Sequence, residues 1–204
     1  PIAVTITAEA GLFSAVSILV GTRGADITAA HQISINFAAT MFMIPLALSA
    51  ATTVRIGHAM GSGNAEAARM GGTTGILMCA LFMSFSATFL LLFRDLVVGM
   101  YTNDPAVTQI AISLLLVAAI FQVADGIQIG AAGALRGYKD TRIPMLINTF
   151  SYWALGFPLA YLATITYQAS PSWIWGGFVL GLSVAAILLT VRFHILSKRM
   201  LTAP

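Results

Sequence analysis

The sequence contains very few charged side chains: 10 basic and 7 acidic residues in 204, or 8% of the chain. Soluble domains carry about 25%, because charged groups keep their surfaces in solution. A disordered chain is also excluded, since disorder goes with few apolar residues and much charge, whereas 58% of this chain is hydrophobic. These proportions predict an integral membrane protein.

Motifs for enzymatic chemistry are scarce as well. Cys79 is the only cysteine, which leaves no disulfide framework and no thiolate metal site. The three histidines lack the spacing of zinc ligands, and no glycine-rich loop ends in Gly-Lys-Ser or Gly-Lys-Thr. The net charge of +3 is scattered between apolar runs, not along a basic stripe. We therefore expect no enzyme, no resident cofactor and no nucleic-acid partner.

Apolar runs long enough to cross a lipid bilayer recur along the chain. A hydrocarbon core of about 30 Å needs roughly 20 apolar residues in a helix, and the alternation of about ten residues seen in barrel strands is missing. Six such runs lie at about 2–20, 30–54, 73–93, 106–135, 143–167 and 173–191. The sequence therefore predicts an all-α integral membrane protein, in which residues 1–204 form a single six-helix lobe.

Basic residues are distributed unevenly between the predicted loops. Eight lie after the second, fourth and sixth runs, whereas two, Arg23 and Arg94, lie on the opposite side. Lys and Arg are retained on the cytoplasmic side of a membrane, so we expect both ends of the chain in the cytoplasm. Tyr101, Trp173 and Trp175 lie near predicted interfaces, where aromatic rings anchor helices among the headgroups.

Two acids, Glu9 and Asp125, differ from the other five because they lie inside apolar runs. A charged side chain there costs about 2.5–3.5 kcal/mol, and no basic residue follows or precedes either acid by one helical turn. All ten basic residues are expected outside the spans or at their ends. We expect both acids to face a wet cavity or the bundle interior, either protonated or holding a cation. The alternative is that each protonated carboxyl merely bonds a neighbouring helix.

Amide side chains accompany the acids on helical faces. Gln122 and Gln128 lie three residues before and after Asp125, and Gln32 and Asn36 lie one turn apart in the second run. Taken alone, such amides more simply join helices together. Their predicted role in binding depends on the acids. The fifth run adds the polar residues Asn148, Ser151 and Tyr152.

Phe13 follows Glu9 by one helical turn, which places an aromatic face beside the carboxylate. A desolvated cation held by Glu9 would gain about 1–2 kcal/mol from such a ring, although ordinary packing is the simpler explanation for Phe13 by itself. Prolines interrupt two runs, at Pro45 and in Gly156-Phe157-Pro158. Each predicts a kink, because proline frees a carbonyl one turn back.

Four motifs occur in a specific order along the chain. They are Ala29-Ala30-His31-Gln32-Ile33 with Asn36, Arg55-Ile56-Gly57-His58, Leu135-Arg136-Gly137-Tyr138-Lys139-Asp140, and Ser151-Tyr152-Trp153 leading into Gly156-Phe157-Pro158. With them the sequence resembles the multidrug and toxic compound extrusion (MATE) exporters, especially the NorM-like bacterial branch. The resemblance implies the second six-helix lobe of a twelve-helix, two-lobe transporter, whose N-terminal lobe would be the missing partner.

The resemblance also implies an activity and a set of residues. MATE exporters of the bacterial inner membrane exchange Na⁺ or H⁺ entering the cell for organic cationic drugs leaving it. Their membrane acids match Glu9 and Asp125, which would hold Na⁺ if Na⁺ is the coupling ion, and their cation-site aromatics match Phe13 and Phe42. The expected substrate-binding residues are Gln32, Asn36, Asp104, Gln122 and Gln128.

Departures and alternatives remain at this point. Phe42 and Phe121 stand where some members have tyrosine, which leaves the choice between Na⁺ and H⁺ open. An exporter of lipid-linked or other cargo with a related fold would need a wider, basic cavity. A non-transporting assembly subunit would use its membrane polar groups only to join helices. Two copies of the chain pairing in parallel would be another way to enclose a central cavity.

Overall fold

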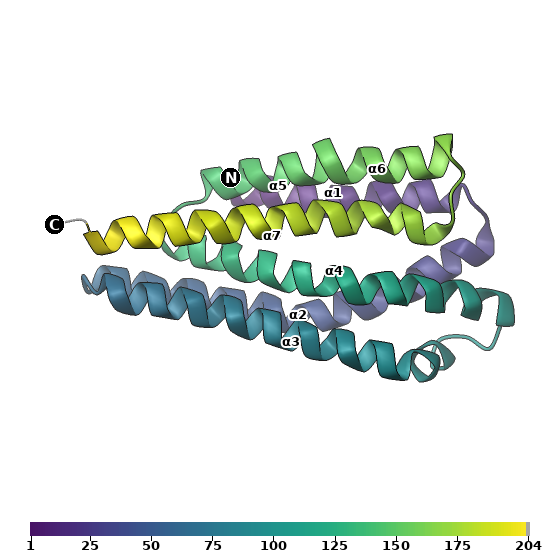
Figure 1. Ribbon diagram of the computed structural model, residues 1–204, viewed down its shortest axis with the longest axis horizontal. Helices are drawn as coiled ribbons and strands as arrows, with labels where there is room; N and C mark the ends of the chain where they lie inside the picture. The colour runs from purple at the N-terminus through teal and green to yellow at the C-terminus, as the bar shows by residue number, and fades with distance from the viewer. Residues whose placement is uncertain (203–204) are drawn as a thin grey trace.

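The computed structural model describes residues 1–202, which form six helical rods joined by short loops (Figure 1). Five helices are long and apolar enough to cross a membrane: α1 (Ile2–Gly21), α2 (Ala25–Gly61), α3 (Ala65–Gly99), α4 (Pro105–Gly137) and α7 (Pro171–Thr202). The remaining rod joins α5 (Arg142–Thr149), η1 (Phe150–Gly156), α6 (Phe157–Tyr161) and η2 (Leu162–Thr166). The predicted all-α membrane fold is thus the one observed.

Several rods extend beyond the apolar runs that predicted them. α2 has 37 residues and α3 has 35, with a break in the helical geometry of α3 at Phe93. At 1.5 Å per residue, the two rods rise by about 56 and 53 Å. The residues after position 191, expected as a tail, continue α7 as far as Thr202. The reason is that hydropathy marks only the part of a helix inside the hydrocarbon, whereas backbone hydrogen bonding continues into the aqueous layers.

Local capping interactions set where two of the helices begin. The Asp104 carboxylate accepts a hydrogen bond from the Ala106 N–H at 2.8 Å, and Pro105 occupies the first helical position. Asn64 Oδ1 likewise accepts from the Ala67 N–H at 2.9 Å. Asp104 therefore has a local structural role at the start of α4.

The rod formed by residues 142–166 departs from regular helix where the sequence predicts a kink. η1 is a π-helical segment that passes into α6 at Phe157, next to Pro158. A π-helical turn accommodates a proline, which has no N–H to donate and crowds the preceding turn. Gly156 also lies against α7, since a Cβ there would come within 2.9 Å of the Gly177 carbonyl oxygen. The rod stays continuous because it widens locally.

α4 lies in the middle of the bundle, between α7 and the α2–α3 pair (Figure 1). Glycines on one of its faces permit this close packing. A Cβ on Gly126 would lie 2.9 Å from the Cys79 carbonyl oxygen, and one on Gly133 would lie 2.6 Å from the Ser49 carbonyl oxygen. Because larger residues do not fit, this face fixes the rotation of α4 about its axis.

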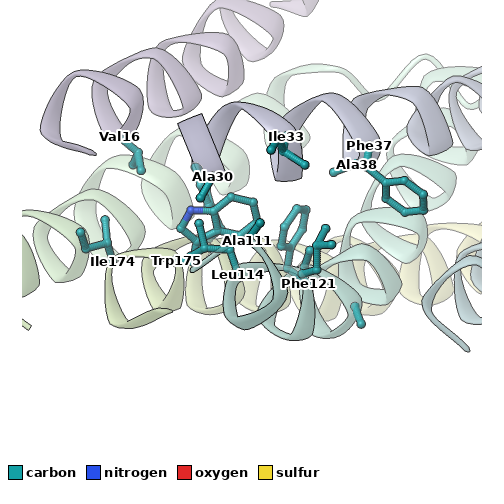
Figure 2. Packing of buried hydrophobic residues seen from close by; sticks show 14 of the residues in the cluster. Val16, Ala30, Ile33, Phe37, Ala38, Ala111, Leu114, Phe121, Ile174 and Trp175 are labelled. Atoms are coloured by element: carbon teal, nitrogen blue, oxygen red, sulfur yellow. The ribbon is translucent and has the colours of Figure 1, made fainter. Parts of the chain in front are cut away.

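The larger buried cluster surrounds Trp175, with contributions from α1, α2, α4 and α7 (Figure 2). Trp175 is completely buried, and its indole N–H donates a hydrogen bond to His31 Nδ1 at 3.0 Å. The expectation that Trp175 anchors the protein at the membrane interface is therefore wrong, because its helix turns this side chain inward. Trp173, two residues earlier, is 67% exposed.

Candidate functional site

A cavity of about 410 Å³ lies between α1, α2, α4 and α5. Glu9 enters its wall from α1 and Asp125 from α4. The volume lies in the range of pockets that hold small molecules, about 300–1,000 Å³. The other polar side chains that line it are Thr5, Gln128, Arg136, Thr141 and Asn148, and its remaining wall is apolar. The two membrane acids thus share one largely apolar chamber.

The polar wall contributed by α4 follows from helical periodicity. Phe121, Asp125, Gln128, Ala132 and Arg136 recur at intervals of three or four residues, and all line the cavity. The glycine face of α4 packs on α2 and α3 at a different angle around the same helix. Rotation of Asp125 toward lipid would therefore require separating α4 from two neighbouring helices.

Asp125 is only 6% exposed, and its Oδ1 atom is buried without a hydrogen-bond partner. Within residues 1–202 the ion pairs shorter than 4.0 Å are Arg94–Asp95 and Arg192–Asp140, so neither membrane acid is paired with a base. A buried carboxylate without a donor or a base is costly. A proton, a metal cation or an organic cation in the cavity would remove this cost.

Two other side chains that line the cavity have buried polar atoms without partners. Gln128 Oε1 is buried without a partner, and so are both amide atoms of Asn148. The hydroxyls of Ser151 and Tyr152, one turn after Asn148, are also buried and unpaired. Folded proteins leave few such atoms unpaired, so the unpaired atoms of Asp125, Gln128 and Asn148 in one cavity indicate a place suited to an ion or to ordered water. The carboxylate and amide oxygens form a hard donor set, the kind that suits a hard cation.

The aromatic residues predicted to lie near a bound cation both line the cavity. Phe42 enters from α2, and Phe13 enters from α1. The Phe13 ring is stacked on Phe178 with a centroid distance of 4.5 Å and an interplanar angle of 24°. Packing against α7 therefore explains one face of Phe13, while its position in the wall is compatible with a contact to a cation.

Arg136 is a cavity residue that the sequence analysis did not single out. Its Nη2 donates to Ser49 Oγ at 2.8 Å, and its Nε is buried without a partner. Arg136 lies in the last turn of α4, as expected of a basic residue at the end of a span, but its side chain also lines the cavity that contains both acids. Arg136 follows Asp125 by eleven residues, or about three turns, which places both on one helical face. A basic residue one helical turn from Asp125 would be recognised in the sequence as its partner, whereas one three turns away on the same face is easily overlooked.

Two residues expected to bind substrate lie on the outer side of α2. Gln32 and Asn36 are both exposed, and Asn36 Oδ1 accepts a hydrogen bond from the Tyr101 hydroxyl at 2.9 Å. Neither residue lines the cavity described above. Their predicted role would need a surface outside this chamber, such as one facing a second lobe.

Asp104 and Gln122 also lie outside the cavity. Asp104 is exposed at the start of α4, and Gln122 Oε1 accepts a hydrogen bond from Ser86 Oγ at 2.9 Å. Gln122 therefore joins α4 to α3. Of the predicted site residues, the structure brings together Glu9, Phe13, Phe42, Asp125 and Gln128.

Comparison with known proteins connects this arrangement to a family. The family model described as MatE matches residues 1–162. The chain belongs to the MatE family. Solved members share its fold: "Crystal structure of MATE in the straight conformation" gives a TM-score of 0.88 at 18% identity, covering 98% of this chain and 45% of that one. The resemblance inferred from the four motifs is thereby confirmed.

Curated MatE relatives are considerably longer than this chain. Over 200 residues it is 46% identical to "Probable multidrug resistance protein NorM" of Xanthomonas axonopodis pv. citri, covering 98% of this chain and 44% of the relative. Over 203 residues it is 41% identical to "Multidrug resistance protein PmpM" of Pseudomonas aeruginosa, covering 98% and 43% respectively. The chain thus spans less than half the length of these relatives, and it is a multi-pass membrane protein like other members.

Proposed function

We propose that these residues form one lobe of a multidrug efflux antiporter that exchanges Na⁺ or H⁺ for organic cations. The observation that carries this proposal is the pair of acids, Glu9 and Asp125, which share one apolar cavity without an ion pair. The relatives named multidrug resistance proteins support it. A second six-helix lobe is the expected partner, because the chain covers 44% of such a relative.

Competition for the two carboxylates provides the coupling. When ionised, Glu9 and Asp125 attract a lipophilic cation into a chamber of low dielectric constant. A H⁺ or Na⁺ arriving from outside binds the same carboxylates and removes that attraction, so the organic cation leaves. Inward movement of one H⁺ or Na⁺ releases about 2.3 kcal/mol per 100 mV, and outward movement of one monovalent organic cation costs the same amount. A one-for-one exchange is therefore driven by the concentration gradient of the coupling ion. No step in this cycle requires enzymatic catalysis.

The distribution of basic residues supports an orientation in the bacterial inner membrane. Both chain ends, the α2–α3 loop and the α4–α5 loop lie at the same end of the bundle (Figure 1). Eight basic residues lie in these loops or in the adjoining parts of the helices, against Arg23 and Arg94 at the opposite end. We place this basic end, including the C-terminus, in the cytoplasm. Thr141 and Pro144 line the cavity from this end, so the chamber lies toward the cytoplasmic side.

The test removes each charge separately from the complete transporter that contains this chain. Glu9→Gln and Asp125→Asn should each abolish dye efflux driven by an imposed pH or Na⁺ gradient, with membrane insertion and thermal unfolding unchanged. Glu66→Gln, which changes an exposed acid at the start of α3, is the matched control and should transport normally. Efflux at the wild-type rate in both membrane-acid variants would contradict the proposal.

One observation favours a second candidate, an exporter of anionic or lipid-linked cargo: Arg136 lines the cavity. Such a transporter would depend on this guanidinium and would gain from losing the acids, because carboxylates repel an anion. In the same assay, anionic cargo should then require Arg136 and move faster in Glu9→Gln. A subunit without transport activity would show no efflux in any variant, and its polar groups would be expected to pair with one another, unlike Asp125 Oδ1.

A further inference from the structure

We infer that Arg136 is a tethered internal cation that leaves the cavity with a net charge of −1 and so selects singly charged organic cations over doubly charged ones. This inference rests on the proposed function and names the substrate class of that same site. It goes beyond the two acids, because it assigns a specificity to the third charged residue of the chamber.

The charges that line the chamber lead to this assignment. Two carboxylates, Glu9 and Asp125, and one guanidinium, Arg136, are its charged side chains, and together they sum to −1 when the acids are ionised. An arginine does not lose its proton inside a protein, so its positive charge is permanent. One monovalent cation therefore neutralises the chamber, whereas a dication leaves an excess of +1 in a region of low dielectric constant.

The arginine is positioned without cancelling either acid by direct contact. It forms no ion pair within 4.0 Å in residues 1–202, and the helical rise separates it from Asp125 by about 16 Å along α4. Both acids therefore remain open to a cation from solution, while the guanidinium acts across the chamber through its field.

A chain of two hydrogen bonds through Ser49 holds the guanidinium in the wall. Arg136 Nη2 donates to Ser49 Oγ at 2.8 Å, and the Ser49 hydroxyl donates to the Ile129 carbonyl oxygen at 2.8 Å. Arg136 Nε remains buried without a partner. The same stretch of the wall contains Thr141 and Pro144, which belong to the basic end of the bundle. A cation entering from that end meets the arginine before it reaches Asp125, and a dication is repelled twice as strongly.

The experiment compares two cations of similar size in the complete transporter reconstituted in liposomes. Methylphenylpyridinium carries one positive charge and methyl viologen carries two. We expect wild type and Arg136→Lys to favour the monocation in kcat/KM, and Arg136→Gln to shift the ratio toward the dication by about tenfold or more. Arg136→Lys distinguishes the effect of the positive charge from that of the hydrogen bonds, because lysine keeps the charge but lacks the planar guanidinium with its fixed donors.

A second variant keeps Arg136 and tests whether the net charge of the cavity sets the charge of the preferred cation. Gln128→Glu is close in size and adds a negative charge to the cavity wall, so we expect the same shift toward methyl viologen. An unchanged ratio in a folded Arg136→Gln or Gln128→Glu protein would overturn the inference. The inference would also be overturned if Arg136→Gln transported neither cation and Arg136→Lys restored transport of both. Transport of neither cation by wild type would instead contradict the proposed function, which separates the two failures.

Discussion

The indole Nε1–H of Trp175 donates a hydrogen bond to His31 Nδ1 at 3.0 Å, and this determines which imidazole nitrogen carries the proton. An indole only donates, so Nδ1 accepts and the neutral ring is protonated at Nε2. That nitrogen donates to Ser17 Oγ at 2.9 Å, and the Ser17 hydroxyl donates to the Phe13 carbonyl oxygen at 2.8 Å. The chain of bonds joins α7, α2 and α1 beside the cavity wall that contains Phe13.

Trp175→Phe should destabilise the lobe, because it leaves the buried Nδ1 of His31 without a donor. The expected loss in free energy of unfolding is about 1–3 kcal/mol, measured by denaturant unfolding in detergent. Trp173→Phe is the matched control, since Trp173 is 67% exposed and should change stability little. Equal effects of the two substitutions would argue against the structural role of the Trp175–His31 bond.

Gly133→Ala should push α4 away from α2, because its Cβ would lie 2.6 Å from the Ser49 carbonyl oxygen. We expect a loss of about 1–3 kcal/mol in stability from this overpacking, together with slower efflux, since Ser49 holds Arg136. Gly57→Ala is the control: a Cβ at Gly57 meets nothing within 4 Å, so this variant should be as stable as wild type or more so. Thermal unfolding and efflux measured on both variants check the prediction.

Arg23→Gln should loosen the turn between η2 and α7. Arg23 Nη1 donates to the Thr164 carbonyl oxygen at 3.2 Å, and its Nη2 donates to the carbonyls of Gln168 and Ala169, both at 3.1 Å. Amide hydrogens of residues 162–170 should exchange faster in the variant, and the global stability should fall by about 1–2 kcal/mol. Arg94→Gln, which removes a solvent-exposed ion pair of 3.9 Å, should leave exchange in this segment unchanged.

Gln128 and Gln122 should differ in their effect on transport, although they are equally spaced from Asp125. Gln128 lines the cavity, whereas Gln122 accepts a hydrogen bond from Ser86. Gln128→Leu should raise KM for an organic cation several-fold, and Gln122→Leu should mainly lower thermal stability. Efflux kinetics and thermal unfolding of the two variants distinguish them, and a larger KM effect in Gln122→Leu would contradict the assignment.

Hydropathy was sufficient to locate the six rods, and position within the rods was sufficient to single out Glu9 and Asp125. Apolar length is a local property, and so is the cost of a charge inside an apolar run. The sequence was less informative about side-chain direction on neighbouring faces. Gln122 and Gln128 have equivalent spacing, but α3 packs against one of them and the cavity lies beside the other. The prediction for Trp175 was wrong for the same reason: the position of a residue in the sequence does not show which neighbouring helix its side chain meets.

The sequence by itself determined a six-helix membrane fold, its family and the two acids inside it, because length, hydropathy and burial cost act along a single helix. Only the tertiary structure decided that the acids share a chamber with Arg136 and that Gln32, Asn36 and Asp104 lie outside it. That arrangement depends on how closely α4 approaches α2 and α3. The approach is set by glycines and a few interhelical hydrogen bonds, whose partners lie tens of residues away in the chain.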